Sequence, residues 1–97
     1  MIDVVLLPEA EEDLSDTAAF LERRVPGLGD RLVAEVEYAL GRLAENPYVG
    51  PHLVQDVRKL RVRRFPYNLI YRILPSHVLV LAVAHHRRRR KFWRGRR

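Results

Sequence analysis

The hydrophobic pattern of the chain changes period once, near residue 46, and this change limits the possible folds more than any other feature. Before it, apolar residues recur every three or four positions, as in amphipathic helices; after it, they recur every second position, as in half-buried strands. The chain has 97 residues, which is enough for one hydrophobic core but not for two. We therefore expect a single α+β domain over residues 1–97, with two helices packed on a sheet.

The N-terminal part begins with a short apolar strand over residues 2–7. Pro8 suits the first turn of a helix, and the acidic residues after it suit the positive end of the helix dipole. The first helix should bury a stripe made of Ala10, Leu14, Ala18, Leu21 and Val25. Asp13, Asp16 and Glu22 lie off that stripe and are expected to face water.

A second helical stripe follows after Pro26 and Gly27. It is made of Leu28, Leu32, Val36, Ala39, Leu40 and Leu43. This helix should stop at Asn46, because a residue before proline disfavours helical geometry. The connection between the two helices is short, which predicts an antiparallel hairpin whose stripes cover the sheet.

Three strands are expected in the C-terminal part. In residues 59–63, Leu60 and Val62 should point to the core, and the three cations Lys59, Arg61 and Arg63 to the opposite face. Residues 68–74 and 78–85 should form a hairpin around a turn at 75–77. Residues 78–84 are apolar at every position, which indicates a central strand. The predicted order is βααβββ, with a mainly antiparallel sheet and a basic tail over residues 87–97.

Charge is divided between the two parts of the chain. Residues 1–56 hold all 12 Asp and Glu against four Arg, a net charge of −8, whereas residues 57–97 hold 14 Lys and Arg and no acid. The basic part should attract polyanions or acidic proteins, with binding that weakens as salt is added. A plain nucleic-acid-binding module would explain this charge, but no helix is rich in Arg and Lys as a recognition helix requires.

Cysteine is absent, which excludes disulfides, thiolate nucleophiles and Cys-based zinc sites. His52, His77, His85 and His86 lack the spacing of metal ligands, so no metal site is expected. Residues 2–7 include Asp3 and follow no basic leader, and the longest apolar run is far shorter than the ~20 residues of a membrane span. We expect a soluble cytoplasmic protein with no membrane partner.

Four motifs in this order resemble the toxin superfamily of type II toxin–antitoxin systems that contains the ParE and RelE proteins. They are Pro8-Glu9-Ala10-Glu11-Glu12-Asp13-Leu14 after the first strand, Leu43-Ala44-Glu45-Asn46-Pro47 with Gly50, Arg63-Arg64-Phe65-Pro66-Tyr67 with Ile70-Tyr71-Arg72, and Val80-Leu81-Ala82-Val83-Ala84-His85-His86-Arg87-Arg88. The resemblance implies a bacterial toxin that needs no cofactor and is neutralised by a cognate acidic antitoxin. ParE-like members inhibit DNA gyrase, whereas RelE-like members are mRNA endonucleases that act on the ribosome.

The two branches make different chemical demands. Metal-free RNA cleavage needs a proton acceptor, a proton donor and cations around the phosphate, and the candidates here are His85, Arg61, Arg88 and Tyr71. RelE-like enzymes usually carry a tyrosine near the C-terminus, but the matching stretch reads Lys91-Phe92-Trp93. The missing phenol favours the ParE-like branch, with ribosome-dependent mRNA cleavage as the alternative.

Several candidate residues have a structural interpretation beside the functional one. His85 could end the central strand and complete a hydrogen-bond network at its rim, and His86 should point to the opposite face if the strand continues that far. Tyr67 and Tyr71 should share a face as packed aromatics or serve as functional phenols. Phe92 and Trp93 could anchor a partner or fold back on the core. In toxins similar to this one the antitoxin lies along the sheet groove and the C-terminal segment. The residues expected to bind it are Lys59, Arg61, Arg63, Arg72, Arg88, Phe92 and Trp93.

Overall fold

The computed structural model describes residues 1–88 and 92–96, and its elements follow the predicted order with one addition. They are β1 (Asp3–Leu6), α1 (Pro8–Arg24), α2 (Leu28–Glu45), β2 (His52–Val54), β3 (Val57–Arg61), β4 (Tyr67–Ile73) and β5 (His77–His85). The added strand, β2, has only three residues and an irregular register with β3. Such a short segment carries too few residues to show a period of two, which is why the sequence pattern missed it.

The strands form one five-stranded sheet in the order β1-β5-β4-β3-β2. β1 runs parallel to β5, and every other neighbouring pair is antiparallel. β5 thus lies between β1 and β4, and its residues from Val78 to Ala84 are all buried. The predicted α+β class and the central position of this strand are both confirmed.

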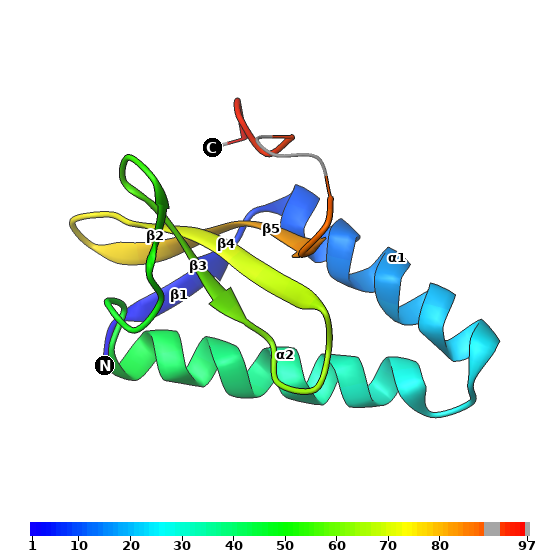
Figure 1. Cartoon of the computed structure of the whole chain (residues 1–97). Coiled ribbons are helices and arrows are strands. Elements are labelled where there is room, and N and C mark those ends of the chain that lie inside the picture. The colour runs from blue at the N-terminus through cyan, green and yellow to red at the C-terminus, as the bar shows by residue number, and fades with distance from the viewer. Residues whose placement is uncertain (89–91, 97) are drawn as a thin grey trace.

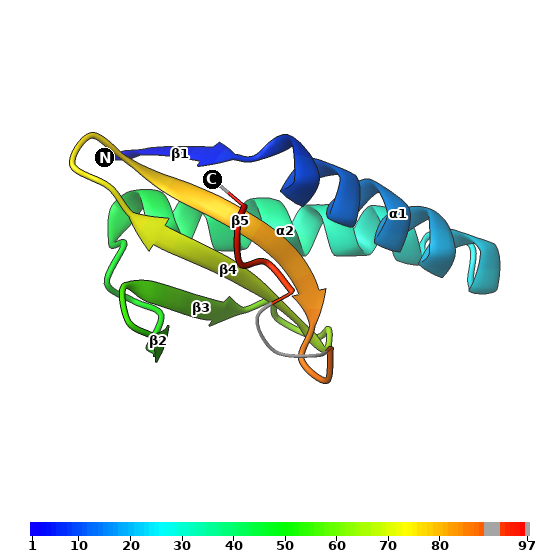
Figure 2. The same ribbon diagram turned by 90° about the horizontal axis from the view of Figure 1, so that it is seen from above.

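The sheet has a different cover on each face. α2 runs along one face, and the C-terminal segment 92–96 crosses the other, as Figures 1 and 2 show. α2 buries Leu32, Val36, Ala39 and Leu43 completely or nearly so, which are members of its predicted stripe. We call the face away from α2 the outer face. Because α2 covers the opposite face, the predicted partner-binding residues of the sheet can meet a partner only on the outer face.

α1 packs beside α2 and against β5, and its C-terminal half extends past the end of the sheet (Figure 2). Ala10 is fully buried, but Val25 is 52% exposed because it lies beyond the last helical turn in an extended conformation. The predicted stripe therefore ends at Leu21. Within the described residues, no helix has the length and apolar character needed to cross a membrane.

The link between the helices depends on two glycines and one carboxylate. Gly27 has φ of +88°, a backbone conformation that glycine adopts at little cost. Glu22 accepts hydrogen bonds from the backbone N–H groups of Gly27 and Gly29, at 2.7 and 3.0 Å. A Cβ at Gly29 would meet the carbonyl oxygen of Ala18, so glycine also permits the close approach of the helices. Glu22 caps the following helix, a role that the prediction of a solvent-facing residue did not include.

Candidate functional site

The outer face carries a hollow of about 340 Å³ between the sheet, β2 and the C-terminal segment. We call it the outer groove. In the sheet register, Lys59 of β3 pairs with Ile70 of β4, and Asn68 of β4 pairs with Ala84 of β5. These four side chains therefore come from three adjacent strands. The groove is lined by Leu53, Val54, Lys59, Asn68, Ile70, Ala84, His85, His86, Arg88, Phe92 and Trp93.

The cations at this groove have no acidic side-chain partner among the described residues. Lys59 and Arg88 line it, and Arg61 lies close enough to His85 for its charge to act on the imidazole. Every Asp and Glu lies in the part of the chain that the structure describes, and none is within ion-pair distance of these three cations. The groove thus combines apolar side chains such as Ile70 and Ala84 with positive charge and the buried amide of Asn68, which suits an acidic segment that also carries apolar side chains.

Arg63 does not join this cationic face, contrary to the prediction. β3 ends at Arg61, and the chain then turns through Arg64, which has φ of +67°. The turn directs Arg63 to α2, where its Nε donates to Glu35 Oε1 at 2.9 Å and its guanidinium lies 3.7 Å from the centre of the Tyr38 ring. The prediction assumed that strand alternation continues to Arg63, but β3 ends two residues earlier, at Arg61.

Arg72 is already occupied by an acid of the same chain. Its Nε donates to Asp56 Oδ2 at 2.8 Å, and Asp56 lies in the turn between β2 and β3. The pair is partly exposed, so an acidic partner could still compete for the guanidinium. Arg72 therefore differs from Lys59, Arg61 and Arg88, which have no acidic side chain to exchange, although Arg61 Nε donates to the Phe65 carbonyl oxygen at 2.9 Å.

The two adjacent histidines lie side by side, which corrects the prediction that they point to opposite faces. β5 ends at His85, so strand alternation does not extend to His86, and the ring centroids stack 4.6 Å apart. His85 Nδ1 accepts a hydrogen bond from the Arg87 backbone N–H at 3.0 Å, and its ring meets Tyr67 edge-on. Burial lowers the pKa of His85, and the charges of His86, Arg87 and Arg61 lower it further.

Tyr71 lies in the core and away from the histidines, so the ribonuclease candidates are not brought together. Its side chain is fully buried, and its hydroxyl donates to the Pro47 carbonyl oxygen at 2.7 Å and accepts from the Gly50 N–H at 3.0 Å. Burial raises the pKa of the Tyr71 phenol, although the Gly50 hydrogen bond and the nearby Arg58 charge oppose the change. Tyr71 fixes the loop before β2.

The aromatic pair of the tail folds back on the sheet. Trp93 is 6% exposed and belongs to the hydrophobic core, while Phe92 is half-buried. Arg88 lies 3.8 Å and Arg96 5.1 Å from the centre of the Phe92 ring, within the range of cation–π attraction. Of the two alternatives that the sequence left open, packing on the core describes Trp93. Residues 89–91 and 97 of the predicted basic tail lie outside the described residues.

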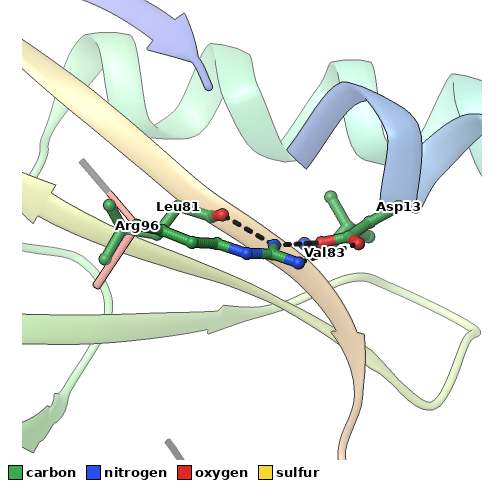
Figure 3. A network of polar contacts seen from close by, with 4 residues as sticks. All are labelled: Asp13, Leu81, Val83 and Arg96. Atoms are coloured by element: carbon green, nitrogen blue, oxygen red, sulfur yellow. Dashed lines mark hydrogen bonds and ion pairs between the residues drawn. The ribbon is translucent and has the colours of Figure 1, made fainter. Parts of the chain in front are cut away.

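An ion pair between the two ends of the chain holds this segment, and sequence reasoning missed it (Figure 3). Arg96 donates to Asp13 Oδ2 at 2.7 Å and to the Leu81 carbonyl oxygen at 3.0 Å. Asp13 also accepts the Val83 N–H at 3.1 Å. The Arg96 side chain is 18% exposed and the Asp13 side chain 12%. Asp13 is therefore largely buried, contrary to the prediction that it faces water. Their separation of 83 positions left no local signal.

The position of this pair follows from the end of β1. Pairing between β1 and β5 stops at Leu6 and Val80, and one further bond joins the Leu7 N–H to the Val80 carbonyl oxygen. The edge of β5 beyond Val80 therefore needs other hydrogen-bond partners, since buried backbone groups are rarely left unpaired. Asp13 and Arg96 supply an acceptor and a donor there.

Among the described residues, no three His, Asp or Glu side chains are grouped so that they could hold a metal ion.

Solved structures with similar folds come from toxin–antitoxin complexes. One is the chromosomal ParDE toxin–antitoxin system from P. aeruginosa, with a TM-score of 0.77 and 19% identity over 88% of this chain and 96% of that one. Another is the toxin–antitoxin complex RelBE2 from Mycobacterium tuberculosis, with a TM-score of 0.59 and 30% identity over 87% of this chain and 90% of that one. A comparison with curated protein sequences gave no match.

A family model covers most of the chain. The model of the ParE toxin of the type II toxin–antitoxin system parDE matches residues 4–90, a range that runs from β1 to the end of β5 and beyond it. The predicted resemblance to the ParE-like branch is confirmed by this match. The chain belongs to the ParE toxin family of type II toxin–antitoxin systems.

Proposed function

We propose that the protein is a growth-inhibiting toxin that binds DNA gyrase and is held inactive by a cognate acidic antitoxin in the outer groove. The observation that carries the proposal is the match of residues 4–90 to the ParE toxin family. The groove adds support, because Lys59, Arg61 and Arg88 have no Asp or Glu within ion-pair distance among the described residues, which leaves their positive charge available. Complementary charge gives such a pair rapid, salt-sensitive association.

The site favours binding over RNA cleavage. The Tyr71 hydroxyl has its donor and acceptor roles filled by Pro47 and Gly50, so it is not placed to exchange a proton with a substrate. Trp93 stands near the position where RelE-like enzymes place a tyrosine, and it is packed in the core. A proton-transfer catalyst must reach the reacting atom within hydrogen-bond distance, and neither aromatic residue offers a group that does so.

One observation keeps the mRNA endonuclease as a second candidate. His85, His86 and Arg88 line the same groove, and Arg61 acts on His85 through its charge. A neutral imidazole can accept the 2′-hydroxyl proton, and the arginines can stabilise the negative charge that builds on the phosphate. In that case His85 would be the proton acceptor after its Nδ1 gives up the hydrogen bond from the Arg87 N–H, and Arg61 and Arg88 would contact the phosphate.

Expression of the toxin alone separates the two activities. Plasmid topology and transcript integrity are followed in the same culture, and purified toxin is added to DNA gyrase in a supercoiling assay. Loss of supercoiling with intact transcripts supports the proposal. Cuts in translated messages with normal supercoiling would replace it with the endonuclease. Co-expression of the neighbouring reading frame, if its product is an acidic antitoxin, should restore growth.

A further inference from the structure

We infer that Asp13 and Arg96 are positioning residues of the outer groove: their ion pair fixes the C-terminal segment 92–96 as one wall of the site for the acidic antitoxin. The inference rests on the proposed function for the identity of the occupant. It rests on the structure for the wall itself, because Phe92 and Trp93 line the groove opposite β2. Neither Asp13 nor Arg96 lines the groove, so both act through the segment that they hold.

The segment has two attachments to the rest of the molecule. Trp93 supplies the apolar one, with its side chain in the core. Arg96 supplies the polar one, with hydrogen bonds to Asp13 and to the Leu81 carbonyl oxygen. Figure 3 shows the Arg96 side chain reaching across β5 to the helix that carries Asp13. Two attachments three residues apart fix both the position and the direction of the segment between them.

The ion pair between Asp13 and Arg96 is partly buried, so its loss should weaken the attachment of the segment. With 18% and 12% of the two side chains exposed, salt screens the pair less than it screens a surface ion pair. Removal of one partner leaves the other charge partly buried without compensation, which is a costly state. Asp13 also accepts the Val83 N–H, so the wall is fixed to β5 directly before Ala84 and His85, which line the groove.

The attachment also determines which charges the groove presents. Arg96 and Arg88 both lie against the Phe92 ring. If Arg96 is released, Phe92 loses one of its two cationic neighbours and the segment is held by Trp93 alone. Arg88 then has no fixed aromatic surface against which to lie. The expected result is a wider groove with less well-placed charge and weaker binding of an acidic partner.

Trp93 provides a direct measure of the attachment, since it is the only tryptophan in the chain. The test compares the wild-type protein with the variants Asp13→Asn and Arg96→Gln, in both of which the ion pair is lost. Asp13→Asn keeps an oxygen that can accept the Val83 N–H. The matched controls are Asp16→Asn, an exposed position on the same helix, and Arg94→Gln, an exposed position in the same segment. Each control changes the net charge by the same amount as its test variant.

Two readouts are needed. Acrylamide quenching and the emission maximum of Trp93 report whether the segment stays docked, and circular dichroism checks that each variant is folded. Affinity for a short synthetic peptide of alternating Glu and Leu reports on the groove. We expect Trp93 of both test variants to be quenched more strongly than Trp93 of the wild type, and peptide affinity to fall roughly tenfold, equivalent to about 1.4 kcal/mol. Arg96→Lys, which keeps the charge, should recover part of both signals.

Three results would overturn the inference. Trp93 that stays shielded in folded Asp13→Asn and Arg96→Gln would show that the ion pair does not hold the segment. Released Trp93 with unchanged or tighter peptide binding would show that the segment is no wall of the groove. A wild-type protein that does not bind the peptide would remove the role in the groove, while the quenching result would still decide the attachment. Gyrase inhibition is measured separately, so its failure is not confused with any of these.

Discussion

At the scale of single residues, Tyr71 has a structural role, although its phenol is also the kind of group that can transfer a proton in catalysis. Its hydroxyl joins the loop at Pro47 and Gly50 to the middle of β4. Gly50 is required there because a Cβ would meet the Lys59 carbonyl oxygen and the Tyr71 hydroxyl. A tyrosine with both hydrogen-bond roles filled inside a core stabilises the fold.

The substitution Tyr71→Phe should therefore lower stability without changing toxin activity per folded molecule. It leaves the buried Gly50 N–H without its acceptor, which costs about 1–3 kcal/mol. Urea denaturation measures the loss, and Tyr48→Phe at an exposed position is the control. A stable Tyr71→Phe protein with no toxicity would assign the phenol a functional role instead.

His85 should make stability depend on pH near neutrality. Burial is the main cause of its lowered pKa, and the unfolded chain therefore binds the proton more readily than the folded one. Stability contributed by neutral His85 is present above the unfolded pKa of about 6.5, declines as pH falls through that value, and levels off below the folded pKa.

The measurement is the difference in urea midpoint between wild type and His85→Gln at several pH values, with an NMR titration of the imidazole. Arg61→Gln should raise the His85 pKa by a smaller amount than burial lowers it, because the Arg61 charge is the weakest of the four causes. Arg64→Gln is the control for the loss of an arginine from the same region. An unchanged titration in Arg61→Gln would contradict the placement of Arg61 beside the ring.

At the scale of the elements, the helical hairpin depends on a cap that crosses between helices. α2 begins after Gly27, a residue with no side chain, so its first N–H groups need an acceptor from elsewhere. Glu22 of α1 provides one for Gly27 and Gly29. Its negative charge also lies at the positive end of the α2 dipole.

The variant Glu22→Ala should accordingly lose about 0.5–2 kcal/mol of stability, the range of a lost N-cap. Glu37→Ala, at an exposed position within α2, removes the same side chain without a cap and should change stability far less. Chemical denaturation of the two variants gives the comparison. Equal losses would mean that the effect belongs to charge or helix propensity and not to capping.

The turn after β3 separates Arg63 from Lys59 and Arg61, although strand alternation predicts all three on one face. Lys59→Glu and Arg61→Glu should each weaken antitoxin binding about tenfold at low salt, with a smaller effect at high salt. Arg63→Glu should place two carboxylates together beside α2 and lower stability through repulsion from Glu35. Its antitoxin affinity should stay near that of the wild type. Calorimetric titration with the antitoxin at two salt concentrations distinguishes the groups, and a loss of affinity in Arg63→Glu would contradict the structural assignment.

At the scale of the whole molecule, the charge separation along the chain is partly cancelled by the fold. Acids of the first 56 residues meet cations of the remainder in three places, Glu35 with Arg63 and Arg64, Asp56 with Arg72, and Asp13 with Arg96. Among the described residues, Lys59, Arg61 and Arg88 at the outer groove remain without an acidic side-chain partner, as do four arginines on the helices, Arg23, Arg24, Arg31 and Arg42. The fold thus leaves part of the net charge of +6 as a local positive field at the groove.

The sequence predicted the elements well because their signals are local. The stripe from Leu28 to Leu43 repeats at helical spacing, and the uninterrupted apolar run of β5 marks a strand covered on both faces. It predicted the site less well. Arg63 and His86 were each assigned by strand alternation, and both lie just beyond the residue at which a strand ends. Strand ends depend on turns and on partner strands, which the alternation of one segment does not contain.

The amino-acid order by itself determined the succession of every element except β2, most of the core residues and the family, because hydrophobic period and motif spacing act over a few neighbouring positions. Tertiary structure decided which cations stay available, where Tyr71 and Trp93 lie, and how Asp13 meets Arg96. Those outcomes depend on the end of β1, which leaves the edge of β5 unpaired beyond Val80. The unpaired backbone groups of Leu81 and Val83 exist only once the sheet has formed, and Arg96 and Asp13, from opposite ends of the chain, supply their hydrogen-bond partners. No local sequence pattern predicts a contact between residues so far apart.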